Sequence, residues 1–304
     1  MVSLMENSGA QRPNILLFIP DGMQAGFTEP ESTCQTPHFD RLAGQGVRCR
    51  RAYTTNPTCS PARTSLMTGR LPHNHGVLQV EHATDPDQNL LRRNLPHWAQ
   101  LLREAGYQTG YFGKWHIEPD EDLSYFGWDW NGSDTQAAFR SIGTGDESVE
   151  SLLEGAPLAR FESEPSGYNS VLHYGVTGVP GEQRAFARTT TAALEFLEQA
   201  EQQSQPWACC VSFSEPNVPL IAGEAAYRKH RSEVTLPENG KDPLEDKPAL
   251  YRRAQQVYHS LKEEEWKECR SVYQGLVHEL DEQFGRLVEK VDLENTLVLI
   301  LSDH

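Results

Sequence analysis

The stretch PNILLFIPDG, residues 13–22, predicts the fold class of the chain. Its nearly continuous apolar run over 13–20 has the length of a strand, and such runs are typical of parallel strands that helices cover on both faces. Further strands are predicted at 107–113, 207–214 and 296–301, with helical segments between them. This alternation predicts an α/β fold with a mostly parallel central sheet flanked by helices.

The helices are predicted from apolar spacing and from residues that start or end helices. Thr36 and Pro37 suit the start of a helix over 37–45, as a cap and as the first helical residue. Further helices are predicted from Pro61 to Gly69, over 95–105, over 183–203 and within 249–290. Residues 47–53 suggest an extended segment, and 117–182, rich in Gly, Asp, Glu and Ser, suggests long loops or an insertion.

Composition limits the classes of partner. The chain has 304 residues, of which 38% are hydrophobic, and this suits a globular protein. Its net charge of −16 argues against nucleic acid and anionic membrane surfaces as partners. No apolar run approaches the roughly 18 residues that a membrane span needs. If the substrate is anionic, positive charge must therefore be concentrated locally.

The cysteines and the first residues suggest a cellular location. The six cysteines, at positions 34, 49, 59, 209, 210 and 269, contain no CxxC pair and indicate neither a disulfide framework nor a zinc cluster. The tail over 1–12 is polar and lacks the apolar region of a signal peptide. We therefore predict a reducing, cytoplasmic compartment.

Acidic and imidazole side chains follow the first and last predicted strands. Asp21 follows the first strand, and Asp303 and His304 follow the last. Because the carboxyl ends of parallel strands meet at one edge of a sheet, these side chains are expected to lie together. The chain stops at the tip of a strand that no helix follows, so we predict a domain that is incomplete at its C-terminus.

One motif carries chemistry. Residues 59–63 read CSPAR, which fits C-x-P-x-R, and the segment continues as TSLMTGR. The chain resembles the sulfatases of the alkaline-phosphatase-like superfamily. The resemblance is carried by the stretch with this motif, TPHFDRLAGQGVRCRRAYTTNPTCSPARTSLMTGR, and by PNILLFIPD, GYQTGYFGKWH and TLVLILSDH. The resemblance implies that 13–304 is the N-terminal catalytic domain of a sulfatase.

The resemblance also implies catalytic roles. Cys59 would be oxidised to formylglycine by a maturation enzyme, and the hydrated aldehyde would attack sulfur. Arg63 would hold the diol oxygen, while Lys114 and His116, two residues apart on extended chain and so on one face, would contact the sulfate and the leaving group. Asn217 stands where many members have a histidine in Pro-His-x-Pro, and it is predicted to contact substrate.

The resemblance further implies a divalent metal, with Asp21, modified Cys59, Asp303 and His304 as ligands. Calcium is the expected ion, with Mn²⁺ or Mg²⁺ as alternatives. Two departures bear on it: Gly22 stands where most sulfatases have a second acidic ligand, and His304 where many have Asn. Both resemble the branch with choline sulfatases and phosphonate monoester hydrolases, and a nitrogen ligand favours manganese.

Three functions remain open at this stage. The first is hydrolysis of an organic sulfate ester, such as a sulfated sugar or an aryl or alkyl sulfate. The second is hydrolysis of phosphonate monoesters or phosphodiesters by the same residues. The third is a binding protein in which Cys59 stays a buried thiol.

Overall fold

The computed structural model describes residues 12–80, 91–118, 122–134, 149–163 and 171–304. A five-stranded sheet lies at its centre, in the order β3-β2-β6-β1-β8, and all its neighbouring strands are parallel. Its strands are β3 (Trp130–Asp134), β2 (Gln108–Lys114), β6 (Trp207–Ser212), β1 (Asn14–Ile19) and β8 (Thr296–Ile300). The predicted α/β class with a parallel central sheet is confirmed.

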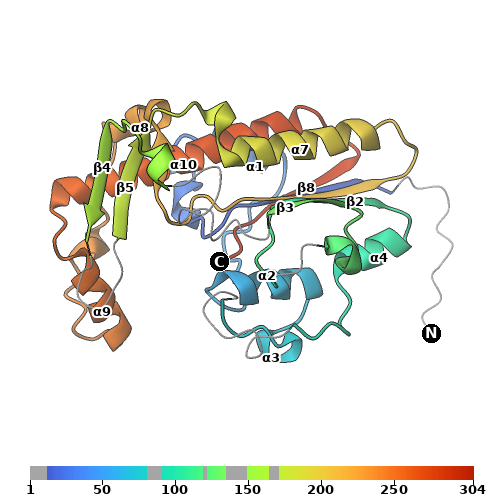
Figure 1. Cartoon of the computed structure of the whole chain (residues 1–304), viewed down its shortest axis with the longest axis horizontal. Helices are drawn as coiled ribbons and strands as arrows, with labels where there is room; N and C mark the ends of the chain where they lie inside the picture. Colours follow the sequence, from blue (N-terminus) through green and yellow to red (C-terminus); the bar gives the residue numbers. More distant parts are fainter. Residues whose placement is uncertain (1–11, 81–90, 119–121, 135–148, 164–170) are drawn as a thin grey trace.

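Helices cover both faces of this sheet (Figure 1). The first face carries α1 (Pro37–Gln45), α7 (Ala185–Ala200) and α10 (Glu263–Val288). The second face carries α2 (Cys59–Thr68), α3 (Pro72–His75) and α4 (Trp98–Glu104). Successive strand residues point to opposite faces, so adjacent Cys209 and Cys210 enter the two different cores, as predicted.

A smaller sheet, β4-β5-β7, lies beside the central one. It consists of β4 (Leu158–Glu162), β5 (Val171–Thr177) and β7 (Ile221–Gly223), and it packs near α8 (Glu224–Arg231) and α10. Helix α9 (Ala249–Tyr258) follows α8 in the chain. The short elements are η1 (Ala25–Phe27), η3 (Leu123–Phe126), α6 (Val149–Leu152), η4 (Gly181–Gln183) and η5 (Glu238–Lys241).

Several elements differ from the sequence-based prediction. The stretch 117–182 contains β3, β4 and β5 where long loops were expected. The helical region 249–290 is two helices, α9 and α10, and α2 begins at Cys59, two residues before Pro61. Residues 47–53 belong to no strand. The predicted polar tail over 1–12 lies, apart from Arg12, outside the described residues.

The start of α1 is held by a distant residue. Thr36 makes no side-chain hydrogen bond to the helix start. Instead, the carboxylate of Asp281 on α10 accepts from the backbone N–H groups of His38 and Phe39, at 3.1 and 2.7 Å. An acid at a helix N-terminus satisfies free donors and suits the helix dipole. Thr36 is at the predicted cap position before Pro37, but its side chain does not cap the helix.

Strand β8 is more exposed than its apolar sequence suggested. Its residues alternate between half-buried and exposed, and Leu297 and Leu299 are 49% and 41% exposed. The strand lies at the edge of the sheet and pairs with β1 alone. Within the part of the chain that the structure describes, no helix combines the length and the apolar character needed to cross a membrane.

Candidate active site

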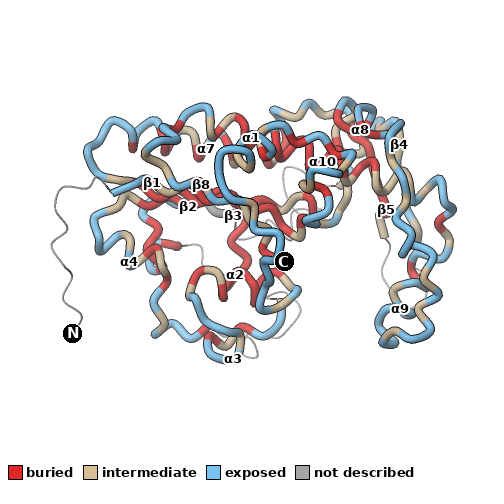
Figure 2. Tube along the Cα trace, turned by 180° about the vertical axis from the view of Figure 1, so that it is seen from behind, coloured by how far each residue is buried: buried red, intermediate tan, exposed pale blue. Residues whose placement is uncertain are grey.

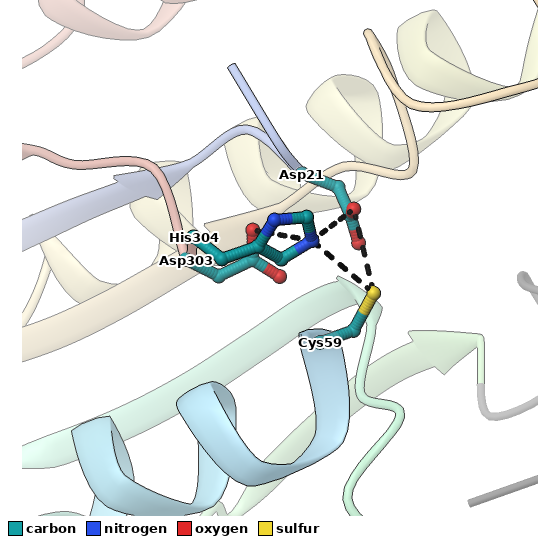
Figure 3. A group of neighbouring side chains, drawn as sticks. All are labelled: Asp21, Cys59, Asp303 and His304. Carbon is teal, nitrogen blue, oxygen red and sulfur yellow. Dashed lines mark hydrogen bonds and ion pairs between the residues drawn. The ribbon is translucent and has the colours of Figure 1, made fainter. Parts of the chain in front are cut away.

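The site lies at the carboxyl edge of the central sheet, where β1 and β8 end. The backbone N–H of Asp21 donates to the Glu215 carbonyl at 3.0 Å, and that of Asp303 donates to the Pro20 carbonyl at 3.4 Å. These bonds tie together the segments that follow β1, β6 and β8. Figure 3 shows Asp21, Asp303 and His304 converging from this edge on Cys59, which begins α2.

Four side chains form a possible metal site. One ligand atom from each of Asp21, Cys59, Asp303 and His304 lies within 4.8 Å of the others. The Cys59 sulfur is 3.6 Å from Asp21 Oδ1 and 3.4 Å from His304 Nε2. The predicted ligand set is therefore gathered in one place, although its binding of a metal stays a prediction.

Arg63 connects this cluster to the sheet behind it. Its side chain is only 1% exposed, because α2 is buried on nearly all sides (Figure 2). Its Nη2 lies 3.2 Å from Asp21 Oδ2, and its Nε lies 2.8 Å from Asp303 Oδ2. Its Nη1 donates to the Lys114 carbonyl and to the Ser212 hydroxyl, at 3.0 and 2.7 Å. Arg63 is thus fixed by contacts on both sides.

Lys114 and Asn217 reach Asp21 from two other strand ends. Lys114, the last residue of β2, pairs with Asp21 Oδ2 through its ammonium group. The Asn217 amide, beyond β6, donates to Asp21 Oδ1 at 2.7 Å and lies 4.0 Å from the Cys59 sulfur. Asn217 therefore stands beside the nucleophile position, where a substrate contact is feasible.

His116 does not lie on extended chain. It follows the end of β2, and its backbone has a positive φ of 53°, so the expected shared face with Lys114 does not follow from strand geometry. Its side chain is buried, at 2% exposure. The position in the turn after β2 keeps it near the carboxyl edge, and its role remains a prediction.

The charges of the cluster set its protonation. Burial alone would raise the pKa of Asp21, but the hydrogen bond with His304 and the charges of Lys114 and Arg63 bring it well below its usual range. Burial opposes the charge of Arg63, yet Asp303 and Asp21 raise its pKa. Hydrogen bonds with Asp21 and Cys59 raise the pKa of His304 to about 10. Asp21 is therefore ionised, and in the absence of metal His304 is cationic.

Gly22 makes room for His304. A side-chain carbon added at Gly22 would lie 3.0 Å from His304 Cε1, which is closer than almost all such contacts. The glycine also has a φ of +62°, a conformation that L-residues rarely adopt. The two departures noted in the sequence, Gly22 and His304, thus fit each other sterically.

The donor set suits a divalent cation. It combines two carboxylates, one imidazole and the position of Cys59, whose sulfur stands where formylglycine would carry oxygen. Asp21 Oδ2 is occupied by Arg63 and Lys114, so Oδ1 is the oxygen that faces Cys59 and His304. Oxygen and nitrogen donors of this kind bind Mn²⁺, Mg²⁺ or Ca²⁺.

The family model described as Sulfatase matches residues 13–304. The chain belongs to the sulfatase family. It is 27% identical over 300 residues to the uncharacterized sulfatase YidJ of Escherichia coli (strain K12), covering 97% of this chain and 57% of that protein. It is 26% identical to the choline-sulfatase of Rhizobium meliloti (strain 1021), with 96% and 57% covered.

The fold is shared with solved structures. The phosphonate monoester hydrolase of Agrobacterium radiobacter superposes with a TM-score of 0.72 at 21% identity, over 96% of this chain and 62% of that chain. The sulfatase chain described here therefore spans about 60% of the length of such relatives. The resemblance to the alkaline-phosphatase-like superfamily is confirmed.

The sequence did not single out Ser212 or Tyr111, although both contact the groups that hold the site. Ser212 ends the apolar strand WACCVS, and Tyr111 is one of several aromatic residues of β2. Nothing in their local sequence distinguishes them from ordinary strand residues. Only the packing of β2, β6 and α2 reveals their contacts.

Proposed function

We propose that the protein hydrolyses an organic sulfate ester, such as a sulfated sugar or an aryl or alkyl sulfate, through a formylglycine made from Cys59. The observation that carries this proposal is the meeting of Cys59 with Arg63, Lys114 and the Asp21–Asp303–His304 ligand set at one sheet edge. A maturation enzyme that oxidises the thiol is the partner that the proposal requires.

The start of α2 suits a nucleophile that attacks an anion. Cys59 is the first residue of the helix, so the N-terminal end of the helix dipole favours negative charge beside it. One oxygen of the hydrated aldehyde would attack sulfur and displace the alcohol. The second hydroxyl would then lose its proton, restore the aldehyde and expel sulfate, so one difficult step becomes two easier ones.

The charge balance supports a role for a metal. In the cluster the carboxylates of Asp21 and Asp303 offset the cations of Arg63 and Lys114, and a His304 that binds a metal would be neutral. A divalent ion held by Asp21, Asp303, His304 and modified Cys59 would supply the excess positive charge that a sulfate requires. Calcium and manganese are both compatible with this set, and the imidazole of His304 favours manganese.

The other residues have supporting roles in this proposal. Arg63 holds the nucleophile and the two carboxylates in place, and Lys114 stabilises charge on the sulfate oxygens. His116 donates a proton to the leaving group. Asn217 donates a hydrogen bond to the substrate and, as an amide, cannot transfer a proton at neutral pH.

A second candidate is hydrolysis of phosphonate monoesters or phosphodiesters. The steric fit of Gly22 with His304 favours it, because that pair gives the site one carboxylate fewer than most sulfatases have. Parallel kinetics of the full chain on an aryl sulfate and an aryl phosphate diester separate the two. A kcat/KM higher for the sulfate supports the first candidate, and the reverse order supports the second.

Peptide mass spectrometry across Cys59 tests the proposed nucleophile. The expected product is an aldehyde, and the Cys59→Ala variant is expected to lose at least about a thousandfold in kcat. The matched control is Cys49→Ala, at an exposed cysteine outside the cluster, which should leave kcat unchanged. Undiminished hydrolysis by Cys59→Ala would remove the basis of the proposal, and an unmodified thiol would favour a binding protein.

A further inference from the structure

Four polar groups meet directly behind the site, where β2 and β6 end beneath α2. They are the Arg63 guanidinium, the Lys114 carbonyl and the hydroxyls of Ser212 and Tyr111. The side chains lie out of water, since Arg63 and Ser212 are each 1% exposed and Tyr111 is fully buried. Buried polar groups are costly unless they are paired. The hydrogen-bond partners of these four groups therefore indicate what holds them in place.

These groups are joined in one hydrogen-bond network. Arg63 Nη1 donates to the Ser212 hydroxyl at 2.7 Å and to the Lys114 carbonyl at 3.0 Å. The Tyr111 hydroxyl donates to the same carbonyl at 2.5 Å. The network therefore runs from Ser212 through Arg63 and the Lys114 carbonyl to Tyr111.

The donors of this network that face it are used. The two N–H groups of Arg63 Nη1 are taken by the Ser212 oxygen and the Lys114 carbonyl. The Tyr111 proton is taken by the same carbonyl, which therefore accepts twice. A buried network of paired groups holds its members in fixed positions.

The network fixes the two cations of the site from behind. With Nη1 held by the network, the other nitrogens of Arg63 face forward to the carboxylates of Asp21 and Asp303. The backbone of Lys114 is held by the same network, and its ammonium group reaches Asp21. A small displacement of either cation would weaken stabilisation of the transition state more than binding of substrate.

We infer that Ser212 and Tyr111 are positioning residues, which set Arg63 and Lys114 for ester hydrolysis through this hydrogen-bond network. The inference rests on the proposed function, because it assigns the two residues to that reaction. Neither hydroxyl has to touch the substrate. Their contribution should therefore fall on kcat rather than on KM.

The experiment compares Ser212→Ala, Tyr111→Phe and the double variant in the full chain, with aryl sulfate and aryl phosphate diester as substrates. Each single variant is expected to lower kcat at least about tenfold and to change KM less than about twofold. Because the Lys114 carbonyl and Arg63 join both hydroxyls in one network, the kcat of the double variant should lie no more than about threefold below that of the less active single variant.

Thr109→Val is the matched control. Thr109 is also buried in β2 and donates its hydroxyl to a backbone carbonyl, that of Gly127, at 2.6 Å. Its removal should lower thermal stability as much as Tyr111→Phe does but leave kcat unchanged. An unchanged kcat in both Ser212→Ala and Tyr111→Phe, or losses that multiply in the double variant, would overturn the inference.

The experiment distinguishes failure of this inference from failure of the proposed function. If the wild-type chain hydrolyses the phosphate diester but no sulfate, the substrate class is wrong, and the same comparison still tests the role of the network. If it hydrolyses neither, crystal structures of wild type and Ser212→Ala decide. The inference then requires a displaced Arg63 side chain, and an unmoved one overturns it.

Discussion

The two faces of the central sheet are covered by different kinds of side chain. On the face under α1, α7 and α10, Phe18 packs against Phe39, Phe213 and Phe284, with ring centroids 4.8–5.9 Å apart. On the face under α2, the core is also aromatic, but the buried helix brings Arg63 into it. Both faces hold buried charge, since Asp281 on α10 is also fully buried, but only the α2 face places such a charge in the site.

The difference indicates where stability and chemistry lie. Apolar contacts need no partner of a particular geometry, whereas each buried polar group must find one. On the α2 face the partners of Arg63 lie at the ends of β2 and β6 and just after β1 and β8, so its position depends on the sheet as a whole. Changes on the first face should therefore affect stability alone, and changes on the second should affect the site.

The largest effect is expected for Phe284→Ala on the first face. Phe284 is fully buried and packs on Phe18 and Phe39, each with a centroid distance of 5.3 Å. Its truncation leaves a cavity and should reduce the free energy of unfolding by about 3–5 kcal/mol, as measured by urea denaturation. The kcat of the molecules that remain folded should stay within about twofold of wild type.

The control for this change is Leu250→Ala on α9. Leu250 is 72% exposed, so its truncation should change the free energy of unfolding by less than about 0.5 kcal/mol. A large loss of kcat in folded Phe284→Ala would contradict the division of roles between the two faces.

The sequence was sufficient where the physical signal is local. Apolar runs located β1, β6 and β8, and the alternation of strands and helices led to the correct sheet. The placement of Asp21 and Asp303 after strands was enough to predict that they meet, because parallel strands end at the same edge. The motif around Cys59 identified the family.

The sequence was insufficient where the signal depends on distant residues. The carboxylate that caps α1 comes from Asp281, more than 240 positions away from the helix start. The weakly periodic segments 158–162 and 171–177 form strands because β5 pairs with both β4 and β7. The contacts of Ser212 and Tyr111 depend on the position of Arg63 in the fold, which the local sequence does not show. The positive φ of His116 was not predicted, because the residue at that position is not a glycine.

An intermediate effect is expected from pH on the α2 face. Burial lowers the pKa of His75 to about 4 from 6.5. Its Nδ1 accepts from the Val77 N–H, so protonation would place two donors against each other. The unfolded chain takes up the proton near pH 6.5, so stability is complete above that pH and falls as the pH drops toward 4.

Between pH 7 and 5 this residue alone should cost about 2 kcal/mol of unfolding free energy. In His75→Gln, the decrease in stability over that interval should be smaller by this amount in urea titrations at the two pH values. The exposed His73 provides the control, since His73→Gln should keep the wild-type decrease. An identical pH dependence in His75→Gln and wild type would show that His75 titrates normally.

The smallest effect on stability is expected for Gly22→Ala, which should affect metal binding more than stability. Gly22→Ala places a residue with a side chain at a φ of +62° and pushes its Cβ to 3.0 Å from the His304 ring. The backbone strain should cost about 1 kcal/mol of stability. Displacement of the imidazole should also weaken Mn²⁺ binding at least about tenfold in a calorimetric titration.

Gly69→Ala separates the two consequences. Gly69, which ends α2, has nearly the same φ of +65° but open space where a Cβ would stand. The same loss of about 1 kcal/mol is therefore expected, with unchanged Mn²⁺ affinity. Equal Mn²⁺ affinities in the two variants would mean that His304 does not need the space at Gly22. A loss of Mn²⁺ affinity in Gly22→Ala alone would show that the His304 imidazole requires a glycine at position 22, where most sulfatases have a second acidic ligand.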